Sequence, residues 1–288
     1  MSSGRPKITV LIPCKDEERH LAACIDSVSW CDEILVADSG STDKSKAIAQ
    51  EKGARIIERE YIHSANFKNW AIPQCTHEWV LIIDSDERVT PELRAEIEAT
   101  LSADPAAFAD MYAIGRINHF MGQRINHCGW ETDTVNRLFK RDRCEYPNLA
   151  VHADLQFKAN LATPGRAGKL RAKFLHYTYY SFDQYLKNKF VPYTTRSAED
   201  LIGKGRRRAS WLNLFFRPPI RFIKMYFLRL GFLDGKAGLI LCTLASFWVF
   251  MKYAKLWGML EAPEKTPLSP RSTLPPDVIA EIRAIQST

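Results

Sequence analysis

The chain has 288 residues, 46% of them hydrophobic and 25% charged, so it is long enough to bury a sizeable core. It is expected to form one large domain or one domain with an appendage, and its sequence shows no internal repeat. The net charge of +7 is uneven, because residues 1–150 carry −6 and residues 151–288 carry +13. This basic half indicates a nucleic acid or an anionic membrane as partner.

The seven cysteines are odd in number and form no CxxC pair. This pattern argues against a disulfide framework or a zinc site, and it predicts free thiols in a reducing compartment. The N-terminal stretch MSSGRPKITVLIPCKDEE returns to charged residues after one short apolar run. We therefore expect no signal peptide there.

Strand and helix patterns alternate through the first hundred residues. Short strands are predicted at residues 8–12, 33–37, 55–58 and 79–83, and helices at residues 17–28, 42–52 and 65–75. Thr90 is expected to cap a further helix that has Pro91 at its first position. The alternation predicts an α/β fold with a mostly parallel sheet covered by helices. Ligands of such sheets bind at the carboxyl ends of the strands.

Polar segments follow three of these strands directly: IPCKDEE, ADSGSTD and DSDER. In a parallel sheet all three lie on one rim. At the tip of the second strand, Asp38 could accept hydrogen bonds from a base or a ribose. Alternatively, Asp38 and Asp43 only form the turn and cap the next helix.

The stretch LIIDSDERV places Asp84, Asp86 and Glu87 together at the end of an apolar strand. Their mutual repulsion has to be offset by a metal ion, a cationic side chain or protonation. Asp84 and Asp86 are two residues apart and face one side of an extended chain, so both could approach a Mg²⁺ or Mn²⁺ ion held by a diphosphate. Alternatively, the acids flank the helix after Thr90, with Arg88 as their neutralising neighbour.

PCKDEE, DSGSTD, the lysine of FKNWA and DSDER, at these intervals, resemble the nucleotide-sugar half of glycosyltransferase family 2. The usual pattern there is P-x-x-N-E, D-D-G-S-T-D, A-R-N and D-x-D. Further segments, HCGWETDTVNRLFKR, NLAVHADL, LHYTYYSFDQYLKNK and YFLRLGFLDGKAGL, resemble the branch of lipopolysaccharide-core β-1,4-glucosyltransferases. The resemblance extends over roughly residues 7–257.

The resemblance implies a GT-A fold, that is, a Rossmann-like α/β sheet, and inverting transfer from a nucleotide-diphosphate sugar. The donor-binding positions that it implies are Pro13, Lys15, Glu17, Asp38, Lys68 and Asp84. Asp86 would be the main metal ligand, for Mg²⁺ or Mn²⁺, with Asp84 facing the ribose or the metal. Two positions depart from the family pattern: Asp16 replaces the usual Asn, and Ser39 replaces the second Asp.

Inversion in one displacement needs a carboxylate that takes the proton of the acceptor hydroxyl. The branch usually shows GW-x-P-D before RLF, so Asp133 occupies the position of this base. Thr132 stands where proline is usual, and Glu131 is close enough to compete for the role. Alternatively, both are surface acids on a turn.

Several other positions are candidate ligands. His152 is expected to be a third metal ligand or an acceptor contact, with a structural role as the alternative. Arg137 and His176 suit contacts with a phosphate or the acceptor. The aromatic residues that would stack on a sugar or lie in the core are Trp130, Phe139 and Tyr177.

The basic residues of the second half are interleaved with large apolar ones in KGRRRASWLNLFFRPPIRFIKMYFLRLGFL. Helices of this composition lie in the membrane interface, so we expect an anionic membrane surface as partner and no nucleic acid. The uncharged run at residues 237–251 would span about 22 Å as a helix, short of the ~30 Å hydrocarbon core. The alternative is a pair of core helices with a solvated basic face.

The predicted domains are a catalytic domain at residues 1–200, a basic and apolar helical appendage at 201–260 and a loose proline-rich tail at 261–288. The expected function is metal-assisted transfer from a UDP-glucose-like donor to a lipid-linked or lipopolysaccharide-type acceptor. The expected location is the cytoplasmic face of a bacterial inner membrane, peripheral or monotopic. The alternatives are a non-catalytic nucleotide-sugar-binding module, a protein or peptide glycosyltransferase, and a sugar nucleotidyltransferase. The last would need a glycine-rich basic loop where IPCKDEE stands.

Overall fold

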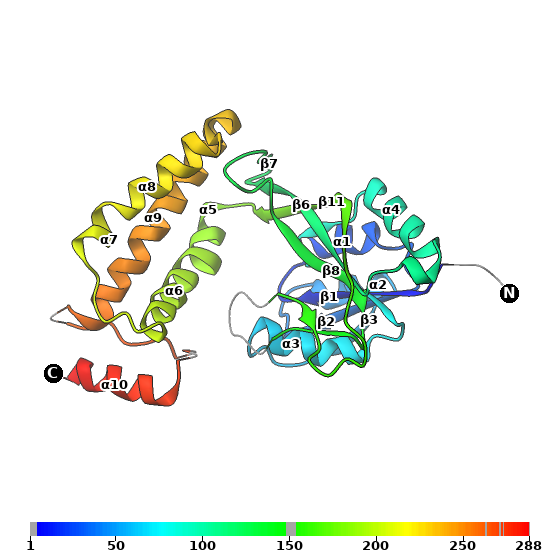
Figure 1. Cartoon of the computed structure of the whole chain (residues 1–288), viewed down its shortest axis with the longest axis horizontal. Coiled ribbons are helices and arrows are strands. Elements are labelled where there is room, and N and C mark those ends of the chain that lie inside the picture. Colours follow the sequence, from blue (N-terminus) through cyan, green and yellow to red (C-terminus); the bar gives the residue numbers. More distant parts are fainter. Residues whose placement is uncertain (1–4, 148–153, 263, 271, 273, 288) are drawn as a thin grey trace. The chain divides into compact units, whose positions relative to one another are not determined.

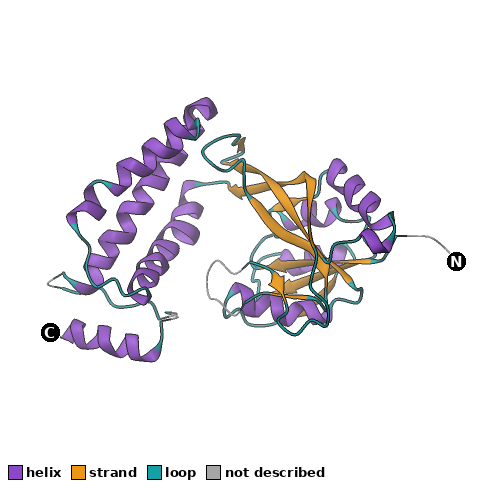
Figure 2. Ribbon diagram, in the orientation of Figure 1, coloured by secondary structure: helices purple, strands orange, loops and turns teal. Residues whose placement is uncertain are grey.

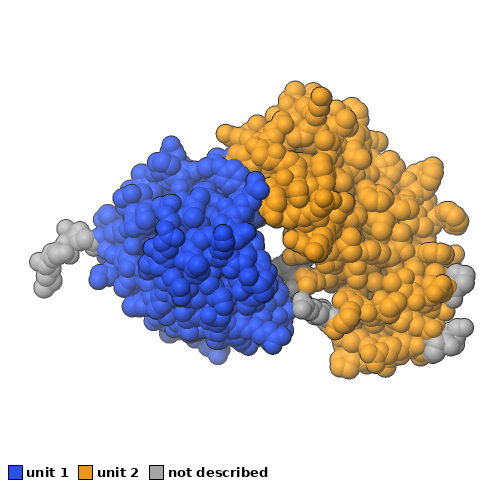
Figure 3. Space-filling model, turned by 180° about the vertical axis from the view of Figure 1, so that it is seen from behind, with its two compact units in different colours: residues 1–118, 132–177 blue, residues 119–131, 178–288 orange. Residues whose placement is uncertain are grey.

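A computed structural model describes residues 5–147, 154–262, 264–270, 272 and 274–287. The chain forms two compact units, which Figure 3 colours separately. Unit 1 comprises Met1–Asn118 and Thr132–Tyr177, and unit 2 comprises His119–Glu131 and Thr178–Thr288.

Unit 1 is built on the four predicted strands, which pair in parallel in the order β3-β2-β1-β4 (Figure 1). Their bounds are β1 Ile8–Cys14, β2 Glu33–Asp38, β3 Arg55–Glu58 and β4 Trp79–Ile82. The register aligns Cys14 at the end of β1 with Asp38 at the end of β2. The polar segments after these strands therefore leave the sheet on one rim, as expected.

The sheet continues beyond β4 with strands of mixed direction (Figure 2). β8 (Thr134–Lys140) pairs antiparallel with β4, β6 (Met111–Phe120) pairs antiparallel with β8, and β11 (Ala167–Tyr179) follows β6. β5 (Glu87–Arg88) pairs with β11, and β7 (Gln123–Arg124) pairs with β6. β9 (Cys144–Glu145) and β10 (Gln156–Phe157) form a separate antiparallel pair. Strand β8 brings its side chains beside the carboxyl end of β4.

The helices of unit 1 occupy the predicted intervals between strands. They are α1 Leu21–Ser27, α2 Ser45–Glu51, α3 Ser64–Ala71 and α4 Pro91–Ser102, with 3-10 turns at Ile72–Gln74 and Pro105–Ala107. The predicted cap of α4 is confirmed, because the Thr90 hydroxyl accepts a hydrogen bond of 3.2 Å from the Leu93 N–H. Helix α1 begins later than predicted, since residues 17–20 form the turn that leaves the rim.

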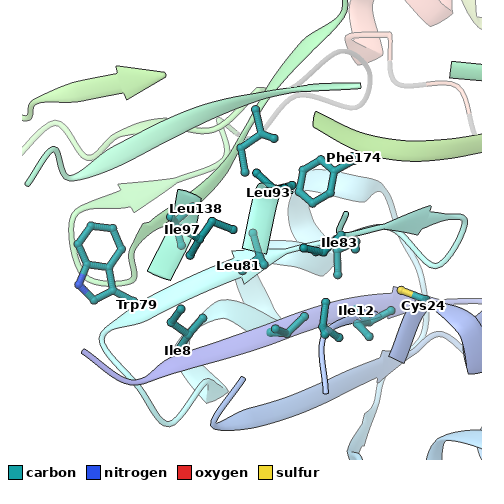
Figure 4. Close-up of a cluster of buried hydrophobic side chains, with 14 of the residues drawn as sticks. Ile8, Ile12, Cys24, Trp79, Leu81, Ile83, Leu93, Ile97, Leu138 and Phe174 are labelled. Carbon is teal, nitrogen blue, oxygen red and sulfur yellow. The ribbon is translucent and has the colours of Figure 1, made fainter. Parts of the chain in front are cut away.

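Both faces of the central strands β1 and β4 are buried, which explains their continuous apolar sequences. Alternate residues of β1 point to opposite faces. Ile8 and Ile12 pack with Leu93 and Ile97 of α4 in one cluster, part of which is drawn in Figure 4. On the other face, Leu11 belongs to a second cluster, formed with α3. The rim is therefore carried by strands that are fixed from both sides.

Unit 2 is helical apart from β7 and the ends of β6 and β11. Its helices are α5 Phe182–Gln184, α6 Val191–Gly203, α7 Trp211–Phe215, α8 Arg217–Ile223, α9 Gly235–Leu260 and α10 Pro276–Ser287. Two π-helical segments, Tyr185–Phe190 and Lys224–Leu228, and a 3-10 turn, Gly231–Asp234, complete it.

Unit 2 differs from the predicted division at residues 200 and 260. Ala198 and Ile202 of α6 pack with Tyr253 and Leu256 of α9, so α6 belongs with the C-terminal helices. The tail was expected to be loose, but it contains α10, whose Ile282 is fully buried in the same cluster. The apolar residues of VIAEIRAI, which follow the last prolines, are spaced as in an amphipathic helix.

The uncharged run of residues 237–251 lies inside the longer helix α9, which has 26 residues. Within the described residues, one helical stretch, Gly231–Leu260, is long and apolar enough to cross a membrane by length and composition, with a mean hydropathy of 1.5. Flanking residues thus extend the helix beyond the uncharged run on which the 22 Å estimate was based. The same helix also packs against α6 and α8.

Glu33, at the start of β2, joins the amino ends of the parallel strands opposite the rim. Its carboxylate accepts hydrogen bonds from the Thr9 hydroxyl (2.6 Å), the Thr76 N–H (2.8 Å) and the Arg55 guanidinium (2.8 Å). Burial opposes ionisation, but these hydrogen bonds outweigh it and lower the pKa of Glu33 to about 2. The ionised carboxylate thus stabilises the fold.

We predict that Glu33→Gln lowers the free energy of unfolding by about 2 kcal/mol at neutral pH. The folded-state pKa is depressed, so this contribution is complete above the ordinary pKa of 4.5 and is lost as the pH falls towards 2. Urea unfolding measured between pH 7 and pH 2 should show that the difference in free energy of unfolding between wild type and Glu33→Gln becomes smaller as the pH falls. As a control, Glu58→Gln removes an exposed partner of Lys46 and should change stability little. Equal losses in the two variants would contradict the assignment.

Candidate active site

The loops after β1 and β2 are held together by hydrogen bonds. The Asp16 N–H donates to the Ser41 hydroxyl (2.9 Å), and the Asp16 carboxylate accepts from the Thr42 N–H (2.7 Å). Asp16 has a φ of 52°, a left-handed conformation that Asp and Asn tolerate better than other side chains. Asp16 can therefore replace the usual Asn without loss of the turn. Ser39, the second departure, donates its hydroxyl to the Cys14 carbonyl at 3.1 Å.

Asp38 lies beneath its own turn. It is fully buried, and its carboxylate accepts hydrogen bonds of 2.8 Å from both the Gly40 and Ser41 N–H groups. In this structure the side chain forms the turn, as the alternative interpretation held. A direct contact with a donor stays a prediction. Lys15, also expected to bind the donor, donates to the Gly40 carbonyl and so closes the same turn.

Asp84, at the end of β4, is neutralised by two cationic side chains. Arg137 of β8 binds its carboxylate, and the Lys68 Nζ lies 3.5 Å from its Oδ1. Burial works against ionisation, but Arg137 and Lys68 outweigh it and hold the pKa of Asp84 well below its ordinary value. At Asp84, the repulsion between the close carboxylates is therefore offset by cationic side chains of the protein.

Glu87 was noticed in the acidic stretch but was given no role by the sequence. It is fully buried, and its carboxylate accepts a hydrogen bond from the Asp84 N–H at 3.0 Å. Arg137 lies 3.3 Å and Arg116 lies 3.4 Å from its Oε1. Two strands of the antiparallel half, β6 and β8, are thereby tied to the end of β4.

Asp133 is bound by a guanidinium fork. Arg116 Nε and Nη2 donate to its two oxygens at 2.8 and 2.9 Å, and the Asn118 amide donates to Oδ2 at 3.2 Å. Burial opposes ionisation, but these hydrogen bonds lower the pKa of Asp133. Asp133 is therefore an oriented, ionised carboxylate. Glu131, the competing candidate, belongs to unit 2, where it lies 3.6 Å from Arg229.

Asp86 and His176 face each other at the end of this network. The Asn118 amide group donates to Asp133, so its oxygen faces His176, and the His176 Nδ1 must donate to it at 2.6 Å. The lone pair of a neutral imidazole then lies on Nε2, which is 3.6 Å from the Asp86 Oδ2. A ring nitrogen fixed by a second hydrogen bond and directed at a carboxylate is typical of a metal-binding histidine.

The charge around Asp86 also suits a divalent cation. Glu17 is partly buried, and this burial together with the carboxylates of Asp86, Asp43 and Asp84 raises the pKa of Glu17 to about 7. Mg²⁺ and Mn²⁺ commonly use only one or two protein ligands beside substrate phosphates. Asp86 and His176 fit that requirement, although the described residues contain no cluster of three or more such ligands.

Most predicted site residues come together in unit 1. They are Pro13, Lys15, Glu17, Asp38, Lys68, Asp84, Asp86, Asp133, Arg137 and His176. Trp130 and Glu131 belong to unit 2, and His152 lies outside the described residues. Phe139 is a core residue, whereas Tyr177 packs beside Arg88 and His20.

Three residues of the network, Glu87, Arg116 and Asn118, were not predicted. Arg116 and Asn118 are two residues apart on β6, in the segment MYAIGRINHF, and both are bonded to Asp133. A charged and an amide side chain on one face of an otherwise apolar strand was the available signal.

We predict that Glu87→Gln lowers the free energy of unfolding by about 3 kcal/mol, because Arg116 and Arg137 would each lose a buried charged partner. Urea unfolding followed by circular dichroism measures the change. Glu98→Gln serves as the control, since Glu98 pairs with Arg94 on an exposed helix surface and should contribute less than about 1 kcal/mol. If the two variants are equally stable, Glu87 does not organise the site.

Comparison with known proteins identifies the family. The model of the family described as glycosyl transferase family 2 matches residues 9–157. The lipopolysaccharide core biosynthesis glycosyltransferase LpsC of Rhizobium meliloti is 28% identical over 87% of this chain and 92% of its own. An uncharacterized glycosyltransferase of Rickettsia typhi is 28% identical over 87% of this chain and 86% of its own.

Solved structures were compared in the same way. Glucosyl-3-phosphoglycerate synthase of Mycobacterium tuberculosis, crystallised with Mn²⁺, UDP and glucosyl-3-phosphoglycerate, aligns with a TM-score of 0.33 and 24% identity over 40% of this chain and 44% of its own. The family assignment does not depend on this partial likeness, because the family model covers half of the chain, including the three rim segments. The chain belongs to glycosyl transferase family 2.

Proposed function

We propose that this glycosyltransferase transfers a sugar, with inversion, from a UDP-glucose-like donor to a hydroxyl of a lipid-linked or lipopolysaccharide-type acceptor. The observation that carries the proposal is the polar network on the rim of unit 1. It runs from Asp86 through His176 and Asn118 to Asp133, and from Asp133 through Arg116 and Glu87 to Arg137 and Asp84. This connected network supports the proposal that Asp86 and His176 hold a metal and that Asp133 is the general base.

In the proposed reaction, the Asp133 carboxylate accepts the proton of the acceptor hydroxyl. The acceptor oxygen forms a bond to the anomeric carbon as the bond from that carbon to the diphosphate oxygen breaks on the opposite face. Asp86 and His176 would hold the divalent cation, which when bound neutralises charge on the departing diphosphate. Lys68, near Asp84, supplies a further positive charge from α3.

Arg116 keeps the proposed base, Asp133, ionised and orients its carboxylate. Its fork fixes both oxygens of Asp133 and lowers the pKa of Asp133, so the carboxylate is ionised throughout the neutral range. A lower pKa also makes the carboxylate a weaker base. Proton transfer is then expected to be completed late, when bond formation to the sugar has already acidified the acceptor hydroxyl.

The acceptor class and the cellular location are inferred from unit 2 and from the name of LpsC. Trp211, Phe215 and Leu228 are 83%, 70% and 74% exposed, although they are among the most apolar residue types. Lys224 and Arg217 are exposed between them in the sequence. Large exposed apolar side chains interleaved with basic ones favour a helical surface lying in an anionic membrane interface. A lipid-borne acceptor on a bacterial inner membrane is consistent with this surface.

A screen of UDP- and GDP-sugars for metal-dependent release of the nucleotide tests the proposal. The expected result is release from UDP-glucose or a close relative with Mn²⁺ or Mg²⁺ and none with a chelator. Release that is unaffected by the chelator would remove the metal from the proposal. An enzyme that binds UDP-sugars but never cleaves them, with any acceptor offered, would indicate a non-catalytic module.

We predict that Asp133→Asn lowers kcat by roughly two to four orders of magnitude while donor binding stays normal, because only proton transfer is lost. Asp86→Asn should instead weaken UDP-sugar binding in the presence of Mn²⁺ and leave metal-free binding unchanged. Calorimetric titration and initial rates separate the two effects. Glu131→Gln is the matched control and should keep most of the activity. A large loss in Glu131→Gln with Asp133→Asn nearly unchanged would reassign the base.

We predict that replacing Trp211, Phe215 and Leu228 together with Ser reduces binding to anionic and neutral vesicles by about tenfold or more, since apolar insertion is lost. Vesicle co-sedimentation measures it, and turnover of a small soluble acceptor should be kept. Ile62→Ser, an exposed apolar position in unit 1, is the control. Wild-type binding to anionic vesicles should weaken at 1 M salt, where the Debye length falls to about 3 Å.

The basic cluster of residues 206–208 is a less suitable target for mutation than the exposed apolar residues, because two of its three arginines lie near carboxylates of the same unit. Arg207 is paired with Glu281 at 2.8 Å, and Arg208 lies 3.9 Å from Glu261.

Normal vesicle binding by the variant with Ser at residues 211, 215 and 228 would rule out α7, α8 and the following π-helical segment as the membrane surface.

A further inference from the structure

Unit 2 contains a cavity of about 410 Å³ that the transfer reaction does not use. It lies among Trp130, the end of β11, the π-helical segment Tyr185–Phe190, and helices α8 and α9. This volume is within the range of small-molecule binding sites in proteins. The cavity is therefore large enough to hold part of a ligand.

Three cationic side chains line this cavity, from three separate elements: Lys189, Arg221 and Lys252. No carboxylate is among its lining residues, and no ion pair joins any of the three to an acid in the part of the chain that the structure describes. Lys189 and Lys252 instead lie over tyrosine rings, at 4.0 and 5.0 Å from the ring centres. Positive charge is thus gathered here without a protein anion.

The electrostatics of Lys252 reflect this gathering of charge. The side chain is half-buried, and burial together with the neighbouring Arg217 and Arg221 lowers the pKa of Lys252. Like charges brought together at a partly desolvated place raise the free energy of the folded state unless an anion joins them. Phosphate groups are common anionic partners of clustered Lys and Arg side chains.

The remaining lining of the cavity is apolar and aromatic. Trp130, Trp248 and Tyr185 contribute rings, and Leu241 and Val249 contribute aliphatic surface. A free phosphate ion would leave this surface without a partner. An alkyl chain attached to the phosphate would cover it, and burying the chain away from water would strengthen binding.

We propose that the unit 2 cavity binds the phosphate end of an amphipathic molecule, with the phosphate between Lys189, Arg221 and Lys252 and the start of an alkyl chain against Trp130 and Trp248. A phosphate-bearing acceptor lipid and a membrane phospholipid share this chemistry. Binding needs neither nucleotide sugar nor metal. The phosphate site can therefore be wrong while the proposed transfer reaction stands, and the transfer reaction can be wrong while the phosphate site stands.

Decyl phosphate, below its critical micelle concentration, is the probe for a calorimetric titration of the full chain. Saturable binding is expected, with inorganic phosphate and decyl maltoside each at least about tenfold weaker. If decyl maltoside binds as tightly, the cations have no role and the proposal is wrong. If inorganic phosphate binds as tightly, the alkyl part of the proposal is wrong.

Variants assign the binding to the cavity. Lys252→Met keeps most of the side-chain stem and should weaken decyl phosphate binding about tenfold, whereas Lys252→Arg should restore it. Lys236→Met is the matched control, because Lys236 is an exposed residue of the same helix outside the cavity. Unchanged binding in Lys252→Met, or the same loss in Lys236→Met, would overturn the proposal.

Arg221→Met is a second variant on a different helix, and it should lower affinity to a similar extent. The urea midpoint of each variant shows whether the fold is kept. If Lys252→Met does not fold, the Arg221→Met result decides: normal binding there contradicts the proposed site.

To distinguish the two lipid sources, short-chain phosphatidylglycerol, a phosphodiester, is compared with decyl phosphate, a monoester. Tighter binding of the monoester would favour an acceptor lipid, and equal binding a membrane phospholipid.

Discussion

The buried carboxylate of Glu87 is the interaction on which the site of unit 1 depends. It lies between Arg116 and Arg137 and accepts the Asp84 N–H, so it connects β6 and β8 to the carboxyl end of β4. A buried charge must be paired and hydrogen-bonded to be tolerated. Because its partners also bind Asp84 and Asp133, Glu87 fixes the side chains that carry the proposed chemistry.

This arrangement separates the roles of three carboxylates of the site. Asp84 and Asp133 each have a guanidinium partner, whereas Asp86 faces an imidazole across 3.6 Å. Among these three, Asp86 therefore has the weakest compensation by protein cations, and a divalent cation would stabilise its charge more than that of Asp84 or Asp133. The acidic motif alone does not show which carboxylates have a cationic partner, because the cations come from the surrounding strands.

The sequence predicted best what is determined locally. The four parallel strands, the capped helix after Thr90 and the rim segments follow from periodicity and turn residues, and the structure has them close to the predicted bounds. The partners of Asp133 were missed because they come from β6, and the antiparallel pairing of β6 with β8 that brings them to Asp133 is not recorded in the local sequence pattern. Asp38 was placed correctly at a strand tip, but only the loop geometry shows that its oxygens are occupied by the turn. Likewise, α6 is assigned to unit 2 by its packing on α9, which no local pattern records.

Unit 2 presents positive charge in two physical settings. Its exposed surface alternates basic and apolar residues, which suits a fluid interface, because each side chain can adjust independently. Its cavity, in contrast, is lined by three cations among aromatic rings, and there Lys252 is half-buried and close to Arg221. Fixed charges discriminate between ligands by geometry, whereas a flexible surface responds mainly to charge density. The proposed membrane surface and the proposed phosphate site of unit 2 therefore place different demands on its cationic side chains, one on charge density and the other on geometry.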